Sequence, residues 1–271
     1  MPKVKIDDFE IYYEIHGSGP PVLLVAGLGG EGAYWQPQIE PLSRHFKVII
    51  HDHRGTGQST RQKIEYSVDQ MAGDVVKLMD ALGIENAHLV GHSTGGAIGQ
   101  ILGIEQPKRL RSLFMYASWV KSDPFMQRVM DMRKALVLNV GALAYVRATP
   151  VFLHPNWWIN ASREKLKEAE NKSLATFPDP EIVASRIEAI LAFDRSNELS
   201  KIRTPTLVFC AEDDFLTPLY ASQALAAAIP GARLVVAEKG GHAHSQTTPE
   251  EFNRIVVNYV LEQERRTLCV G

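Results

Sequence analysis

The segment Gly91-His92-Ser93-Thr94-Gly95 places the strongest constraint on what this chain can fold into. It follows a short apolar run and leads into small residues, which is the G-x-S-x-G pattern of a sharp strand-to-helix turn. Such a turn needs glycine at 91 and 95, because a side chain at either position would collide with the neighbouring strand or helix. The pattern predicts strained backbone at Ser93 and a helix N-terminus that favours developing negative charge. A pattern this short also occurs by chance, so the rest of the chain has to support the interpretation.

Short apolar, β-branched runs recur along the chain with helix-like stretches between them. Continuous runs of this kind are typical of parallel strands buried on both faces. They comprise Pro21–Ala26, Phe46–Ile50, Ala87–Val90, Leu110–Met115, Thr206–Ala211 and Arg233–Val236. The alternation predicts an α/β fold with a mostly parallel sheet flanked by helices.

Three further segments complete the predicted elements. Val4–Ile6 and Glu10–Ile15 predict an antiparallel hairpin ahead of the parallel strands. Residues Ser67–Leu82 carry apolar side chains at helical spacing, and Gly83 predicts the end of that helix. Pro249–Arg265 predicts a closing helix, followed by a short frayed tail.

The strand pattern stops between residues 118 and 200, where segments rich in Met, Trp, Phe and Pro take over. We interpret 118–200 as an inserted helical cap, and 1–117 together with 201–271 as the core domain. Aromatic side chains of the cap are candidates for lining an apolar substrate pocket: Trp119, Phe152, Trp157 and Trp158. The alternative is that these side chains form the cap's own core.

Composition narrows the expected partners. The 271 residues include 29 Lys and Arg and 31 Asp and Glu, a net charge of −2, and no basic cluster is interleaved with aromatic residues. We therefore expect a small-molecule partner, and neither nucleic acid nor an acidic membrane surface. The charged N-terminus and the lack of a long apolar run predict a soluble, cytoplasmic protein. The sequence leaves the oligomeric state open.

The two cysteines give no support for a stabilising disulfide. Cys210 lies in an apolar run and is predicted to be buried as a small hydrophobic residue, whereas Cys269 lies near the C-terminus. Neither cysteine has metal-ligand spacing with another cysteine or a histidine, so no metal site is predicted.

The glycine-rich segment Gly27–Gly32 allows two interpretations. It satisfies G-x-G-x-x-G after a strand, and Asp52 ends the next strand, as in a dinucleotide-binding fold. However, bulky residues follow the third glycine where a helix should pack closely on the strand. That interpretation also leaves Ser93 unexplained.

The second interpretation is an oxyanion hole. In hydrolases with this kind of turn, one backbone N–H comes from the loop after the third strand and another from the residue after the nucleophile. Leu28 and Thr94 would be these donors. Asp52–Ser59 then forms a tight turn after the fourth strand, whose polar side chains hold loops together more than they take part in chemistry.

A serine nucleophile needs a histidine to accept its proton and a carboxylate to orient that histidine. The chain order Ser, acid, His is met by Ser93, Asp214 and His242, with the latter two at the ends of later strands. Asp213 is an alternative to Asp214, although the spacing before Pro218 favours Asp214. His244 is an alternative to His242, although the Gly-Gly-His sequence favours His242.

Five motifs in order make the chain resemble the α/β-hydrolase superfamily over nearly its whole length. They are Gly27–Gly30, Asp52–Ser59, Gly91–Gly95, Asp214–Pro218 and Gly240–His242. The resemblance implies an eight-stranded sheet, a helical cap inserted after the sixth strand, and no cofactor. One departure is Ala26, where many members carry histidine, which puts the anchoring of the oxyanion loop in doubt.

Within the superfamily, the chain is similar to small bacterial esterases and lactonases. These include enol-lactone hydrolases, aminoacrylate hydrolases and enzymes that degrade N-acyl homoserine lactones. The segments 27–38 and 152–157 look most like the aminoacrylate hydrolase group.

The resemblance and the motifs together predict a serine hydrolase that cleaves carboxylic esters or lactones through an acyl-enzyme. N-acyl homoserine lactones, and hence quorum quenching, and short-chain esters are the leading expected substrates. The alternatives are an aminoacrylate or carbamate hydrolase of small metabolites, and a non-catalytic protein that binds a small ligand on the same fold.

Overall fold

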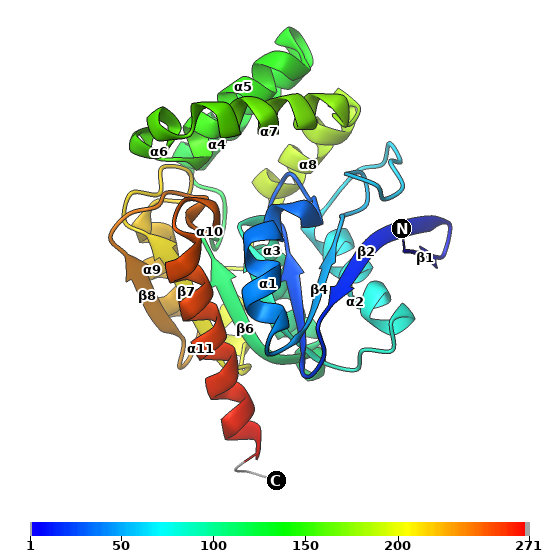
Figure 1. The fold of residues 1–271 in the computed structure, drawn as a ribbon, viewed down its shortest axis with the longest axis vertical. Helices are drawn as coiled ribbons and strands as arrows, with labels where there is room; N and C mark the ends of the chain where they lie inside the picture. Colours follow the sequence, from blue (N-terminus) through cyan, green and yellow to red (C-terminus); the bar gives the residue numbers. More distant parts are fainter. Residues whose placement is uncertain (1, 269–271) are drawn as a thin grey trace.

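A central sheet with helices on both faces forms the body of the molecule, as the computed structural model of residues 2–268 shows (Figure 1). Eight strands make up this sheet in the described residues: β1 (Lys3–Ile6), β2 (Phe9–His16), β3 (Pro21–Val25), β4 (Lys47–His51), β5 (Ala87–His92), β6 (Leu110–Tyr116), β7 (Thr206–Ala211) and β8 (Arg233–Ala237). Their order is β1-β2-β4-β3-β5-β6-β7-β8. β2 pairs antiparallel with β1 and β4, and the later neighbours pair parallel. The predicted hairpin and mostly parallel sheet are confirmed.

Alternate side chains of the central strands pack on opposite faces of the sheet, which explains their continuous apolar runs. Leu23 and Val25 of β3 belong to one core cluster, with α2 (Val68–Ala81), α3 (Thr94–Glu105) and α9 (Leu219–Ala228). Val22 and Leu24 belong to the other, with α1 (Gln36–Ser43) and α11 (Pro249–Leu268). A strand covered on both faces has no polar face to show, so its sequence does not alternate.

Five α-helices lie between β6 and β7 in the described chain: α4 (Pro124–Ala135), α5 (Ala142–Leu153), α6 (Asn156–Ala161), α7 (Arg163–Ala175) and α8 (Pro180–Ala192). A π-helical turn, η3 (Leu136–Val140), joins α4 to α5. In Figure 1, α4 to α7 form a layer above the sheet, while α8 descends toward it. Ile182, Ile187 and Ile190 of α8 belong to the same core cluster as the sheet. We keep the term cap for residues 118–200; its status as a separate domain stays a prediction.

Local signals in the sequence set the ends of the longer helices. The Ser67 hydroxyl accepts a hydrogen bond from the Gln70 N–H at 3.0 Å and caps α2. Gly83 follows α2 with φ of +64°, a conformation that glycine adopts without strain. The closing helix α11 continues to Leu268, beyond the predicted Arg265.

The structure bears on the expected burial of Cys210 and on the expected absence of a membrane-spanning helix. Cys210 is fully buried, as predicted. The first part of the predicted tail, up to Leu268, is helical, and Cys269 lies outside the described residues. Across residues 2–268, none of the helices combines the length and the apolar character that crossing a bilayer requires.

Candidate active site

The turn between β5 and α3 holds Ser93 in a conformation that is rare for a residue with a side chain. Its φ is +53° and its ψ is −113°, and α3 begins at the next residue. The Ser93 N–H donates to the Tyr116 carbonyl at 2.8 Å, and the Ser118 hydroxyl donates to the Ser93 carbonyl at 3.0 Å. Such strain costs about 1–3 kcal/mol and persists only where the surroundings enforce it. The predicted strained turn is therefore present.

Two close backbone approaches explain the glycines of this turn. A Cβ atom at Gly91 would lie 2.3 Å from the Gly95 carbonyl oxygen, and one at Gly95 would lie 2.1 Å from the Val25 carbonyl oxygen. Both distances are far below van der Waals contact. The steric reason inferred from the sequence is confirmed, since α3 and β3 leave no room for a side chain at either position.

His242 and Asp214 form a buried pair at the ends of β8 and β7. The His242 Nδ1 lies 3.0 Å from Asp214 Oδ2 and 3.2 Å from Oδ1. The backbone N–H groups of Leu216 and Thr217 both donate to Asp214 Oδ1 at 2.9 Å. Because a carboxylate only accepts, this network assigns the proton of the imidazole to Nδ1 and leaves Nε2 as a free base.

The structure separates the alternatives that the sequence left open. Asp213 Oδ1 accepts from the Gly241 N–H at 2.7 Å, so this carboxylate holds the loop that carries His242. His244 begins the short helix α10 (His244–Thr247), and its Nε2 lies 3.3 Å from Glu251 Oε2. The side chains brought together are thus Asp214 and His242.

His92, in the variable position of the turn, also supports the His242 loop. Its ring lies between those of Tyr34 and Tyr116, at centroid distances of 4.6 and 4.7 Å, and 4.8 Å from the His242 ring. Its Nε2–H donates to the His242 carbonyl at 3.0 Å, and the Tyr116 hydroxyl donates to the same oxygen at 2.6 Å. Burial holds the pKa of His92 well below its usual value, so it stays neutral. No local sequence pattern predicts the contacts that the two tyrosines make with His92.

The loop after β3 comes close to the turn at Ser93. A Cβ atom at Gly27 would lie 3.2 Å from the Ser93 Cβ, and the Gly30 N–H closes the loop by donating to the Gly27 carbonyl at 3.0 Å. Within residues 2–268, neither the Leu28 N–H nor the Thr94 N–H has a hydrogen-bond partner. Two unpaired backbone donors beside a serine are the arrangement that an oxyanion hole requires.

The dinucleotide interpretation of Gly27–Gly32 is wrong. Gly32 begins a single 3₁₀ turn (Gly32–Trp35), and α1 starts only at Gln36. The Trp35 side chain is fully buried under the sheet. The glycine-rich loop therefore does not lead directly into an α-helix whose N-terminus could bind a pyrophosphate, as the dinucleotide fingerprint requires.

The tight turn after β4 holds loops together, as predicted. Asp52 accepts from the Gly32 N–H at 2.8 Å and from the Gln58 N–H at 2.7 Å. Arg54 pairs with Asp74 on α2, and the Ser59 hydroxyl donates to the Asp52 carbonyl at 2.7 Å. These side chains connect the turn to the neighbouring loop and helix.

His154, at the end of α5, approaches the His242 loop from the cap. The Ala243 N–H donates to the Leu153 carbonyl at 2.9 Å, which ties the two segments together. The His154 ring stacks on Trp158 at 4.4 Å, and in the described structure its buried Nδ1 has no partner. Burial lowers the pKa of His154 to about 4.

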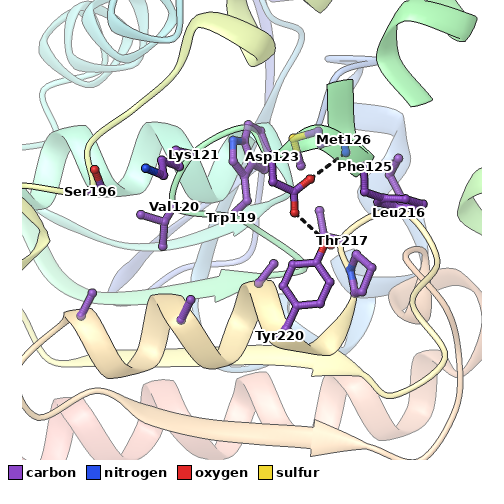
Figure 2. A pocket seen from close by; sticks show the side chains of 14 residues that line it. Trp119, Val120, Lys121, Asp123, Phe125, Met126, Ser196, Leu216, Thr217 and Tyr220 are labelled. Atoms are coloured by element: carbon purple, nitrogen blue, oxygen red, sulfur yellow. Dashed lines mark hydrogen bonds between the residues drawn. The ribbon is translucent and has the colours of Figure 1, made fainter. Parts of the chain in front are cut away.

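A cavity of about 330 Å³ lies between the start of the cap and α9 (Figure 2). It borders the loop after β7 that carries Asp214, which we call the acid loop. Trp119, Phe125 and Thr217 are among its lining residues. At its edge, Asp123 accepts hydrogen bonds from the Met126 N–H at 2.8 Å and the Tyr220 hydroxyl at 2.6 Å. Ser93 does not line this cavity.

The other predicted pocket aromatics lie elsewhere in the cap. Phe152 is buried in the core cluster, 6.4 Å from the Phe215 ring. Trp157 is partly exposed and has Lys239 Nζ 5.5 Å from its ring, and Trp158 stacks on His154. The part of the chain that the structure describes contains no group of three or more His, Cys, Asp or Glu side chains that could hold a metal ion.

A sheet of this topology, a strained serine turn and an Asp–His pair in chain order define an α/β hydrolase. The family model described as "alpha/beta hydrolase fold" matches residues 20–245, and the chain belongs to this family of hydrolases.

The chain is also similar to individual proteins over almost its full length. It is 44% identical over 259 residues to a protein of Azorhizobium caulinodans named "Putative carbamate hydrolase RutD", covering 96% of this chain and 98% of the relative. A Caulobacter sp. K31 protein of the same name is 43% identical, with 92% and 95% covered.

Two solved structures share the fold at lower identity. The enol-lactonase from Burkholderia xenovorans LB400 superposes with a TM-score of 0.89 and 28% identity, covering 96% of this chain and all of the neighbour. Est816, described as an N-acyl homoserine lactone degrading enzyme, has a TM-score of 0.84 and 29% identity, with 95% and 100% covered.

Proposed function

We propose that this hydrolase is a serine enzyme that acts through an acyl-enzyme on small carbamate-type or related acyl substrates. The observation that carries the proposal is the buried Asp214–His242 pair at the same edge of the sheet as the strained Ser93 turn. The two unpaired N–H groups of Leu28 and Thr94 support it. In this proposal Ser93, His242 and Asp214 are the catalytic residues.

The proposed reaction has two halves. Ser93 Oγ attacks the substrate carbonyl carbon while His242 Nε2 takes the hydroxyl proton, and the Leu28 and Thr94 N–H groups bind the resulting oxyanion. The tetrahedral intermediate collapses, and His242 returns the proton to the departing amine or alcohol. Water then attacks the acyl-serine by the same route, which releases the acid and restores Ser93.

The relatives support a small, carbamate-type substrate. Proteins at 44% and 43% identity are named for carbamate hydrolysis. A carbamate carbonyl is a poor electrophile because its nitrogen donates electron density, so its hydrolysis depends strongly on oxyanion stabilisation. Ser93 is only 6% exposed, which favours a small substrate under the cap.

Lactone or ester hydrolysis is a second candidate function. It is supported by the two lactone-degrading structural neighbours and by the mostly apolar cavity that Trp119 lines beside the acid loop. An acyl tail would need such an apolar surface.

A paired substrate panel tests both candidates. It would contain p-nitrophenyl carbamate, p-nitrophenyl esters of increasing chain length and N-acyl homoserine lactones, each with wild type and Ser93→Ala. We expect the highest kcat/KM for the carbamate or the shortest ester, and an initial burst of nitrophenol that reports the acyl-enzyme. If lactones are opened with a much higher kcat/KM than that for cleavage of the carbamate and the esters, the carbamate proposal is wrong and the lactonase proposal takes its place. Absence of labelling of Ser93 by a fluorophosphonate would instead favour a binding protein.

A further inference from the structure

Arg186 reaches from the cap to the loop after β3. It lies on α8, and only 1% of its surface is exposed. Its Nε and Nη2 donate to the Leu28 carbonyl at 3.2 and 3.0 Å, and its Nη1 donates to the Arg54 carbonyl at 3.2 Å. The guanidinium of this cap residue therefore connects the loop after β3, at Leu28, with the turn after β4, at Arg54.

The contacts of this guanidinium are unusual for a buried charge. Arg54 pairs with Asp74, whereas the hydrogen bonds of Arg186 in the described structure go to carbonyl groups and to His53 Nδ1 at 3.1 Å. Burial lowers the pKa of Arg186 to about 10, so it is still cationic at neutral pH. Burying a charge without a carboxylate partner is costly, so stability alone does not explain this arginine.

The position of its main contact connects Arg186 to the chemistry. We infer that Arg186 is a positioning residue that fixes the Leu28 backbone, so that the Leu28 N–H points at the developing oxyanion. This inference rests on the proposed function. Two hydrogen bonds to the Leu28 carbonyl restrict rotation of that residue, and the His53 N–H and the Thr56 hydroxyl hold the Gly30 carbonyl at 2.8 and 3.1 Å.

This arrangement resolves the doubt raised by Ala26. Ala26 offers only a methyl group, which cannot anchor the loop by a hydrogen bond. Arg186 supplies an anchor from the opposite side, and it comes from the cap. The oxyanion hole is thus complete only while α8 is docked on the core, which couples the position of the cap to turnover.

Three variants test the inference with a p-nitrophenyl ester as probe. Arg186→Met removes the donors, and Arg186→Lys keeps a charge but has one nitrogen in place of the planar fork. The matched control is Arg133→Met: Arg133 is also a buried cap arginine, but its Nη2 donates to the Tyr145 hydroxyl within the cap. We expect kcat to fall roughly 10- to 100-fold in both Arg186 variants with KM nearly unchanged, because an oxyanion donor acts mainly in the transition state.

A second readout separates positioning from general damage to the fold. A trifluoromethyl ketone forms a hemiketal whose oxygen occupies the oxyanion hole, so its affinity should weaken in parallel with kcat in the Arg186 variants. Arg133→Met should lose stability but keep its kcat and its affinity for the ketone within about threefold. Should Arg186→Met not fold, the Lys variant decides.

The outcomes distinguish this inference from the proposed function. Ser93-dependent turnover in wild type, combined with Arg186 variants that behave like Arg133→Met, overturns the role of Arg186 alone. A wild type without Ser93-dependent turnover overturns both.

Discussion

The central sheet and the cap bury their side chains to very different degrees. All six residues of β5 are buried, whereas α6 and α7 contain no buried residue in the described structure. Large apolar side chains of the cap face solvent, among them Val140 at 68% and Val151 at 64% exposure. The most buried helix of the cap is α8, which has seven buried residues and carries Arg186; α4 has four and α5 has three.

The sheet and the cap are therefore constrained at different positions. The sheet has one packing solution, because each of its central strands is covered on both faces. The cap is packed unevenly: α6 and α7 contain no buried residue in the described structure, whereas residues of α4, α5 and α8 belong to the same core cluster as the sheet. The most buried cap helix, α8, is the one that reaches the loop after β3, so its packing coincides with the proposed chemistry.

The largest expected effect tests the core. Ser93→Ala should lower kcat by about four orders of magnitude or more, because it removes the proposed nucleophile of a cooperative set. The control is Ser112→Ala, since Ser112 is also a buried serine but contacts His88, outside the proposed site. Ester hydrolysis is the measurement. Retention of most activity in Ser93→Ala would refute the assignment of the nucleophile.

The next prediction compares the loss of kcat when each of two adjacent carboxylates, Asp213 and Asp214, is replaced by an amide. Asp214→Asn should lower kcat by about 10³- to 10⁴-fold, because the amide cannot stabilise the protonated His242 or hold its tautomer. Asp213→Asn should lower kcat by no more than about 10-fold, since its amide oxygen still accepts from the Gly241 N–H. Steady-state kinetics of both variants checks the pair. Equal losses would show that holding the loop matters as much as orienting the imidazole.

Acid should destabilise both regions through buried histidines. Burial lowers the pKa of His51 in β4 and of His154 in the cap to about 4. The unfolded chain binds these protons near pH 6.5 and the folded protein only near pH 4. Stability from each group is therefore fully present above about pH 6.5 and is lost as the pH falls toward 4, by about 3 kcal/mol per histidine.

Urea unfolding at pH 7, 5.5 and 4 measures this loss. His51→Gln and His154→Gln should each flatten the dependence of the free energy of unfolding on pH. A variant with the full wild-type slope would show that the replaced histidine is not the group that titrates.

The smallest predicted effect is on folding stability, when the same Val→Thr substitution is made in the sheet and in the cap. Val48→Thr places a hydroxyl at a fully buried position of β4 and should cost about 1–3 kcal/mol of folding stability. Val151→Thr makes the same change at an exposed cap position and should stay within about 0.5 kcal/mol. Denaturant midpoints provide the comparison. Equal costs would indicate that the cap surface at Val151 is covered in solution.

The sheet could be predicted from the sequence because its signal is local. Runs such as Thr206–Ala211 are apolar without interruption, and that strand has the predicted bounds. The helix predicted to start at Ser67 begins at Val68, since a capping hydroxyl is a short-range signal. The pairing of His242 with Asp214 instead of Asp213 was favoured by spacing alone, and the hydrogen bonds now distinguish them.

Long-range contacts explain what the sequence did not reveal. Arg186 contacts Leu28, 158 positions away, and a single arginine on an amphipathic helix is ordinarily a solvated residue. Tyr34 and Tyr116 contact His92 only because separate strands and loops meet at one edge of the sheet. The cavity at Trp119 depends on how α4 and α9 approach each other, and no sequence period encodes that distance.

The positive φ of Ser93 has a consequence for how this protein can evolve. Glycine adopts such a conformation without strain, so replacing Ser93 by glycine would relieve the backbone while removing the proposed nucleophile. A lineage that loses the reaction could therefore gain fold stability in a single step. Descendants that kept the scaffold to bind small molecules would start with a reserve of stability for new pocket mutations. Under the proposed function, selection for turnover keeps the strained serine in place.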